Sequence, residues 1–355
     1  MTSLSALRAP LIDTYAYYKE YLSAYLKHNQ DYPRSIFLEV TPHCNLRCVF
    51  CPCYIDGEEV FRDRANKYMS YETFTKIIDH ISGRFNFQIC FTYSGEPLLN
   101  RDVFNMIAYL RERQIPSVMH SNALLLTADK TRQVLDAGLD RFIVSLDGAS
   151  KQTYEDVRRG GDFNTVIANV KALLQERTKA GLTRPFVEMQ FVVTSKNKHE
   201  VPAFQTLSRD LKVDYARTKT LLVFQDTQNQ GYIEEVKGYF VEDEVARYNV
   251  EDGGLVLKDA STCPEIQNCI ITVDGDVVMC CFDIHGKYKF GNCIETGLDE
   301  VWRAEGYTEF RRDVMAKRRL SICSFCNTST HVSRDVYQLP RRITFARHFA
   351  HRGGR

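Results

Sequence analysis

The stretch that decides the fold is Thr41-Pro-His-Cys-Asn-Leu-Arg-Cys-Val-Phe-Cys-Pro52, which directly follows the apolar run 36–40. Its three cysteines have the spacing C-x3-C-x2-C: Cys44, Cys48 and Cys51. Thiolates this close on one short loop can bind a common centre, and soft sulfur ligands select iron–sulfur clusters, zinc or copper. A zinc site needs a fourth ligand, which His43 or Cys53 could supply, so both kinds of centre stay open.

The composition is that of an ordinary globular protein. The 355 residues are 44% hydrophobic and 26% charged, and the net charge of +1 gives no reason to expect nucleic acid or an anionic membrane as a partner. The chain starts without a basic segment followed by an apolar one, and no apolar run approaches the ~18 residues of a membrane span. We therefore expect a cytoplasmic protein whose 12 cysteines are reduced and serve as metal ligands or functional thiols.

The cysteines fall into two groups far apart in the sequence. Four lie in residues 44–53 and seven in residues 263–326. Only Cys90 stands between the groups, and because it belongs to the apolar run 89–91 we interpret it as a core residue. Two groups of thiols favour two metal centres.

Short β-branched runs alternate with helical patterns through most of the chain. We predict strands at 36–41, 88–93, 117–121, 141–146, 186–194 and 215–224. We predict helices at 71–82, 102–113, 128–137, 164–180 and 200–211. This alternation indicates βαβ units and a parallel sheet. Functional residues of parallel barrels lie on the loops after the strands, and Cys44 follows the first strand in this way.

The remaining segments flank this α/β region, for which we set the limits 35–224. Residues 1–34 are predicted to form a helical extension, and the polar, Gly-containing residues 225–262 a connection. A small cysteine-rich module is expected over 263–338, followed by a basic tail, 339–355, to which we assign no function.

The cysteine loop, with Phe50 before its third cysteine, resembles the signature of the radical S-adenosylmethionine (SAM) superfamily. The resemblance implies a partial (βα)6 TIM-like barrel with a [4Fe–4S] cluster on Cys44, Cys48 and Cys51 and with SAM on the open iron. It also implies cleavage of SAM to methionine and a 5′-deoxyadenosyl radical, which abstracts a hydrogen atom from a small-molecule substrate. A reducing partner such as a flavodoxin or ferredoxin would supply the electron.

The loop after the second predicted strand, Tyr93-Ser-Gly-Glu-Pro97, resembles the superfamily's Gly-Gly-Glu motif, with Ser94 in place of the first glycine. Gly95 would let the backbone approach a ligand, and Glu96 would accept a hydrogen bond from the amino group of SAM. After the third strand, Asn122 matches the middle of the family's Thr-Asn-Gly, whose neighbours are replaced by Ser121 and Ala123.

Two further motifs follow in the same order. Ser145-Leu-Asp-Gly148 resembles the family's Ser-(Ile/Leu)-Asp-Gly, and the downstream Arg158 would pair with the carboxylate of SAM. Ser145 and Gln190 would bond the carboxylate or the ribose. Each of these residues alone is typical of a structural hydrogen bond, and only their order along successive strands points to a SAM site.

The C-terminal cysteines resemble the beginning of the SPASM extension of radical SAM enzymes, C-x(9–15)-G-x4-C followed by C-x2-C. Because residues 327–355 contain no cysteine, we expect one auxiliary [4Fe–4S] cluster, as in the shortened twitch form. Its implied ligands are Cys263, Cys280, Cys323 and Cys326. A zinc ribbon is the alternative for this spacing.

Cys281 is either itself the ligand or a free thiol beside the cluster, and a plain core cysteine is also open. As a catalytic thiol, it would return a hydrogen atom to the substrate radical and so epimerise the carbon centre. If the auxiliary cluster instead takes an electron and a base takes a proton, a secondary alcohol becomes a ketone.

The single-cluster module resembles that of carbohydrate-acting relatives, and about 34 residues precede the first predicted strand. We therefore expect a small polyol, aminocyclitol or sugar as the substrate. A maturase of ribosomally made peptides and a non-catalytic zinc or Fe–S binding protein are the alternatives.

Overall fold

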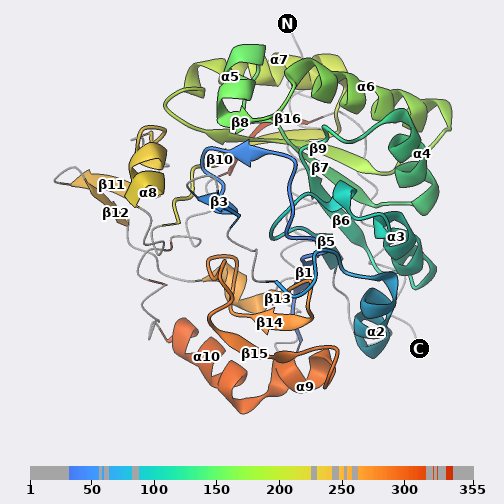
Figure 1. Ribbon diagram of the computed structural model, residues 1–355. Helices are drawn as coiled ribbons and strands as arrows, with labels where there is room; N and C mark the ends of the chain where they lie inside the picture. Colours follow the sequence, from blue (N-terminus) through green and yellow to red (C-terminus); the bar gives the residue numbers. More distant parts are fainter. Residues whose placement is uncertain are drawn as a thin grey trace, which may run out of the picture.

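The computed structural model describes residues 32–55, 58–59, 64–81, 88–224, 230–241, 248–251, 254–257, 263–316, 323, 326 and 333–338. Its centre is a ten-stranded sheet in the order β15-β14-β13-β1-β5-β6-β7-β9-β10-β16 (Figure 1). Six neighbouring strands run parallel: β1 (Ser35–Leu38), β5 (Gln88–Phe91), β6 (Ser117–Ser121), β7 (Arg141–Ser145), β9 (Phe186–Val193) and β10 (Tyr215–Thr220). They coincide with the six predicted runs, which confirms the parallel α/β sheet.

Helices on one side of the curved sheet connect these strands (Figure 1). Five of them confirm the predicted helices: α2 (Tyr71–Ile81), α3 (Val103–Glu112), α4 (Ala128–Ala137), α6 (Phe163–Lys179) and α7 (Val201–Leu211). The seven-residue α5 (Lys151–Val157) was not predicted, because two turns are too short for a helical period to stand out.

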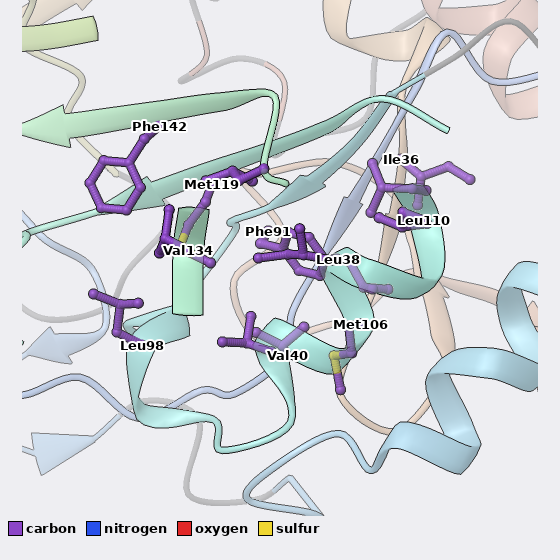
Figure 2. Close-up of a cluster of buried hydrophobic side chains, with 14 of the residues drawn as sticks. Ile36, Leu38, Val40, Phe91, Leu98, Met106, Leu110, Met119, Val134 and Phe142 are labelled. Atoms are coloured by element: carbon purple, nitrogen blue, oxygen red, sulfur yellow. The ribbon is translucent and has the colours of Figure 1, made fainter. Parts of the chain in front are cut away.

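The strands bury alternate residues against the helices, as the two-residue repeat of a strand requires. Ile36, Leu38, Phe91, Met119 and Phe142 belong to this continuous core (Figure 2). The residues between them face the other way, into the barrel. There Cys90 is buried in a small apolar cluster with Val118 and Ile143, which confirms its prediction as a core residue.

The C-terminal part extends the same sheet. β13 (Cys269–Ile271) pairs in parallel with β1, and β14 (Asp276–Val278) and β15 (Lys289–Asn292) follow antiparallel. α9 (Leu298–Arg303) and α10 (Glu305–Met315) pack beside them (Figure 1). β16 (Ser333–Gln338) then pairs antiparallel with β10 at the opposite edge. The edge of β1 is thus covered by strands that lie more than 200 residues later in the chain.

Shorter elements complete the described residues. β2 (Arg47–Cys48) pairs with β8 (Arg158–Arg159), and β3 (Tyr54–Ile55) with β4 (Glu58–Glu59). The predicted connection contains α8 (Gln230–Lys237) and the pair β11 (Tyr248–Glu251) and β12 (Gly254–Leu257). Single turns form η1 (Pro97–Leu99), η2 (Lys198–Glu200) and η3 (Pro264–Gln267). Nearly all of the predicted N-terminal extension and the whole basic tail lie outside the described residues. In the part of the chain that the structure describes, no helix has both the length and the apolarity that a membrane span needs.

Candidate active site

The cysteine loop rests directly on the backbone of Gly95. This glycine has a φ of +68°, and a Cβ atom on it would lie 2.1 Å from the carbonyl oxygen of Thr41 and 2.7 Å from that of His43. The next amide, Glu96 N, donates a 2.7 Å hydrogen bond to the same His43 oxygen. Only glycine fits this approach, so the structure gives the predicted Gly95 a definite role in holding the loop.

A second contact fixes the middle of the loop. Cys48 lies opposite Arg158 in the short β2–β8 pairing, and the Arg158 Nη1 atom is 3.7 Å from the Cys48 Sγ atom. The same guanidinium forms an ion pair with Asp147, whose Oδ2 atom is 2.8 Å from Nε. Because Nε and Nη2 are engaged by Asp147, Nη1 is the part of Arg158 that faces the cysteine loop. The role of Arg158 toward the SAM carboxylate stays a prediction.

The three thiols lie close enough to one another to interact electrostatically. Burial raises the pKa of Cys44 well above its usual range and that of Cys48 to about 12. A hydrogen bond from the buried Cys53 lowers the pKa of Cys51 to about 7. Among the described residues, no three His, Cys, Asp or Glu side chains converge as ligands of one ion do. A cluster does not require such convergence, since its cysteines bind different irons.

The carboxylate of Glu96 joins two motifs. Its Oε1 atom accepts hydrogen bonds from Leu98 N (3.1 Å) and Ser121 Oγ (2.8 Å), and Oε2 accepts one from Asn122 N (2.8 Å). Asn122 Nδ2 in turn lies 3.9 Å from Cys44 Sγ. Burial raises the pKa of Glu96, and these hydrogen bonds oppose that shift. Only Oε2 keeps a lone pair for a further donor such as an ammonium group.

Ser94 bonds to the protein in this structure. Its Oγ atom donates to the fully buried Glu39, whose other oxygen accepts hydrogen bonds from Arg64 Nε (3.1 Å) and Val273 N (2.9 Å). Glu39 thereby ties the end of β1 to the motif loop and to the turn after β13. Sequence reasoning missed Glu39, although a carboxylate that ends an apolar strand is a signal worth following.

Part of the inner face of the barrel, on β7, β9 and β10, is strongly polar. Ser145 and Gln190 are neighbours in register on β7 and β9, and Gln190 Nε2 donates to Glu188 Oε1 at 2.6 Å. Glu188 also forms ion pairs with Arg141 and Arg217, the latter at 2.8 Å. Sequence reasoning named Ser145 and Gln190 but missed Arg141, Glu188 and Arg217. Their signal was the alternation of polar residues within predicted strands, as in Glu188-Met-Gln190 and Arg217-Thr-Lys219.

His120 of β6 belongs to the same inner face. Burial lowers its pKa to about 3, and the cations Lys219, Arg141 and Arg217 add to this shift. The imidazole is therefore neutral at physiological pH and lies in a positive environment.

The C-terminal cysteines form a second site. Cys280 interacts electrostatically with Cys326 and Cys263, and Cys326 N donates to the carbonyl of Cys323 at 3.2 Å. The apolar side chains around Cys280, Cys281, Cys323 and Cys326 include Met279, Phe282, Phe290 and Phe310. Cys281 interacts with the same thiols as Cys280. The structure thus brings together all four predicted ligands and Cys281, and the choice between Cys280 and Cys281 stays a prediction.

Comparisons with known proteins agree with both sites. The family model of the radical SAM superfamily matches residues 38–186, and that of the SPASM iron–sulfur cluster-binding domain matches residues 263–327. The chain is 25% identical over 301 residues to the tungsten-containing aldehyde ferredoxin oxidoreductase cofactor-modifying protein of Pyrococcus furiosus, covering 78% of this chain and 82% of that protein. It is 28% identical over 207 residues to a probable GTP 3′,8-cyclase of Methanocaldococcus jannaschii, covering 58% of this chain and 62% of the cyclase.

Solved structures share the fold. The chain resembles anSMEcpe with bound AdoMet, with a TM-score of 0.58, 16% identity and coverage of 82% and 88% of the two chains. It resembles Streptococcus suis SuiB bound to precursor peptide SuiA, with a TM-score of 0.60, 14% identity and coverage of 85% and 71%. The two domains imply a [4Fe–4S] cluster, SAM and an auxiliary Fe–S cluster, and the two groups of neighbouring thiols fit the two clusters. This chain therefore contains a radical SAM domain, followed by a C-terminal SPASM domain.

Proposed function

We propose that the enzyme removes a hydrogen atom from a small polyol, aminocyclitol or sugar and thereby oxidises or epimerises one carbon centre. The observation that supports this proposal is the polar part of the barrel's inner face, on β7, β9 and β10. TIM-barrel interiors are usually filled with aliphatic side chains. Here Arg141, Glu188, Gln190 and Arg217 stand on the inner face instead.

Charged groups inside a fold need partners or water, because an isolated buried charge is very unfavourable. Glu188 is fully buried between its two arginines, whereas the side chains of Arg141 and Arg217 keep 19% and 20% of their surface exposed. A hydroxyl-rich substrate can replace the water at these side chains with hydrogen bonds, and an apolar substrate cannot.

The names of two relatives point the same way. The Pyrococcus protein is named for modifying a cofactor, and the cyclases are named for GTP. Neither of these two names refers to a peptide substrate, which favours a small molecule over a peptide.

When bound, the cluster and SAM supply the 5′-deoxyadenosyl radical. Glu96 Oε2 would hold the ammonium of SAM and Arg158 its carboxylate, while Ser145 and Gln190 would bond the carboxylate or the ribose. For oxidation of an alcohol, the carbon would lose one hydrogen atom to the radical. The resulting substrate radical would then lose one electron to the auxiliary cluster, and its hydroxyl group would lose one proton to a base. For epimerisation, Cys281 would give back one hydrogen atom from its S–H group, and the thiyl radical left on its sulfur would take up one electron from the reducing partner and one proton from solvent.

The test is isotope transfer under anaerobic conditions. The reconstituted enzyme, SAM and a reductant are mixed with carbon-deuterated polyols, aminocyclitols and sugars, and 5′-deoxyadenosine is analysed by mass spectrometry. We expect deuterium in 5′-deoxyadenosine with at least one of them and none with the Cys44→Ala variant. Transfer from carbon-deuterated peptides alone would overturn the proposal in favour of a peptide maturase.

A further inference from the structure

Tyr93 has a backbone conformation that is unusual for its residue type. It ends the segment after β5 and directly precedes Ser94-Gly-Glu96, and its φ is +108°. Residues other than glycine rarely have a positive φ, and bulky residues do so only where surrounding contacts hold them in that conformation. The contacts of Tyr93 therefore indicate why a tyrosine is tolerated here.

The Tyr93 side chain reaches two loops that are far apart in the sequence. Its ring packs in an apolar cluster that includes Phe50, Cys51, Cys53 and Ile284. Its hydroxyl donates a 2.7 Å hydrogen bond to the carbonyl oxygen of Asp283. The ring thus lies in an apolar cluster to which the cysteine loop also contributes, and the hydroxyl binds the loop that carries Cys280 and Cys281.

The acceptor belongs to a well-defined turn. Asp283 N donates to the Cys280 carbonyl at 3.0 Å, and the Asp283 carboxylate accepts hydrogen bonds from Lys287 N (2.8 Å) and Tyr288 N (2.9 Å). The Asp283 carbonyl also accepts from Gly286 N at 2.9 Å. Through this carbonyl, the Tyr93 hydroxyl is bound to a hydrogen-bonded turn that begins at Cys280, a predicted ligand of the auxiliary cluster.

We propose that Tyr93 is a positioning residue: its side chain fixes the position of the Cys280–Asp283 turn relative to the cysteine loop, residues 41–52. It thereby fixes the distance between the substrate radical and the C-terminal cysteines, across which an electron or a hydrogen atom passes after the first hydrogen abstraction. This inference deepens the proposed function, since it assumes that the C-terminal cysteines take part in turnover. Tyr93 does not touch the reacting atoms in this scheme.

Tyr93→Phe removes only the hydroxyl, and the chain offers a matched control. Tyr232 is in the same apolar cluster, and its hydroxyl donates to a backbone carbonyl, that of Phe50, at 3.3 Å. This hydrogen bond reaches the cysteine loop and not the Cys280–Asp283 turn. Tyr232→Phe therefore loses the same chemical group without losing the link between the loops.

The first readout needs no substrate. In the fully reconstituted enzyme, pulsed dipolar EPR on the two reduced clusters measures the distribution of distances between them. We expect Tyr93→Phe to broaden this distribution at unchanged iron content and Tyr232→Phe to leave it as in the wild type. The proposal is overturned by a wild-type distribution in Tyr93→Phe, or by equal broadening in both variants.

The second readout uses the substrate identified by isotope transfer. We expect product formed per 5′-deoxyadenosine to fall about fivefold in Tyr93→Phe, the factor that corresponds to one net hydrogen bond, and the Kd of SAM to stay unchanged. An unchanged ratio would overturn the proposal. If no polyol, aminocyclitol or sugar transfers deuterium, the proposed function fails, and the EPR comparison still decides the role of Tyr93.

Discussion

The two cysteine sites differ in how the chain builds them. Cys44, Cys48 and Cys51 lie within eight residues on one loop, which is held by the backbone at Gly95 and by the pairing with Arg158. The C-terminal site gathers residues from separate segments: Cys263, Cys280, Cys323 and Cys326. The first site is local in sequence, whereas the second is assembled from segments that are separated by several strands and helices.

Their surroundings also differ. The first site is flanked by the charged side chains of Glu96, Asp147 and Arg158, whereas the second is packed among Met279, Phe282 and other apolar residues. Charged neighbouring side chains suit a centre that binds and releases a charged ligand such as SAM. Apolar neighbouring side chains suit a closed cluster that transfers electrons. One site should therefore govern SAM cleavage, and the other the fate of the substrate radical.

The largest effect should come from the first site. Replacing Cys44, Cys48 or Cys51 by alanine should abolish SAM cleavage, because the cluster loses an iron ligand. Cys53→Ala is the matched change, since Cys53 is buried beside Cys51 and outside the predicted ligand set. It should leave anaerobic cleavage, measured as 5′-deoxyadenosine formed, largely intact. The assignment would be wrong if Cys53→Ala abolished SAM cleavage while alanine at position 44, 48 or 51 left it intact.

The independence of the second site can be tested by iron content. A variant with alanine at 44, 48 and 51 should keep about four irons per chain, because the auxiliary cluster remains. In that background, Cys280→Ala should lose the iron, and Cys281→Ala should keep it. The opposite pattern would make Cys281 the ligand and remove it as a hydrogen donor. In the otherwise intact enzyme, Cys281→Ala should stop an epimerisation and leave an oxidation active.

A smaller effect is expected at Glu96. Glu96→Gln removes the charge that would pair with the ammonium of SAM, an interaction worth roughly 1.5–3 kcal/mol, so SAM affinity should weaken by about one to two orders of magnitude. Equilibrium dialysis with labelled SAM measures this change. Because Glu96 also accepts from Ser121 Oγ, Ser121→Ala reports how much comes from disturbing that internal hydrogen bond alone. Equal losses in the two variants would count against a direct contact with SAM.

The sequence predicts what depends on local spacing. All six parallel strands and five of their helices follow from their periodicity, and the C-x3-C-x2-C loop marks its own site. The pairing of β13 with β1 could not be predicted, because two strands so far apart in sequence carry no local sign of their partner. The roles of Glu39 and Tyr93 were missed for the same reason, since their partners Val273 and Asp283 come from the C-terminal part.

The smallest expected effect is a pH dependence of the free energy of unfolding that comes from His120, on the inner face of the barrel. His120 stays neutral in the folded protein because its pKa is lowered to about 3, whereas in the unfolded chain it titrates near 6.5. The unfolded state therefore binds the proton more readily, so this contribution to stability is complete above about pH 6.5 and is lost as the pH falls toward 3.

Between pH 8 and pH 6, the wild type should lose about 0.8 kcal/mol more of its free energy of unfolding than His120→Gln does, since glutamine takes up no proton. Urea unfolding at pH 8, 7 and 6 measures the difference, and other titrating groups cancel because both proteins share them. Equal slopes for the wild type and His120→Gln would mean that the imidazole is hydrated. The barrel interior would then be open to water at β6, and the cations around His120 would be screened rather than held close to it.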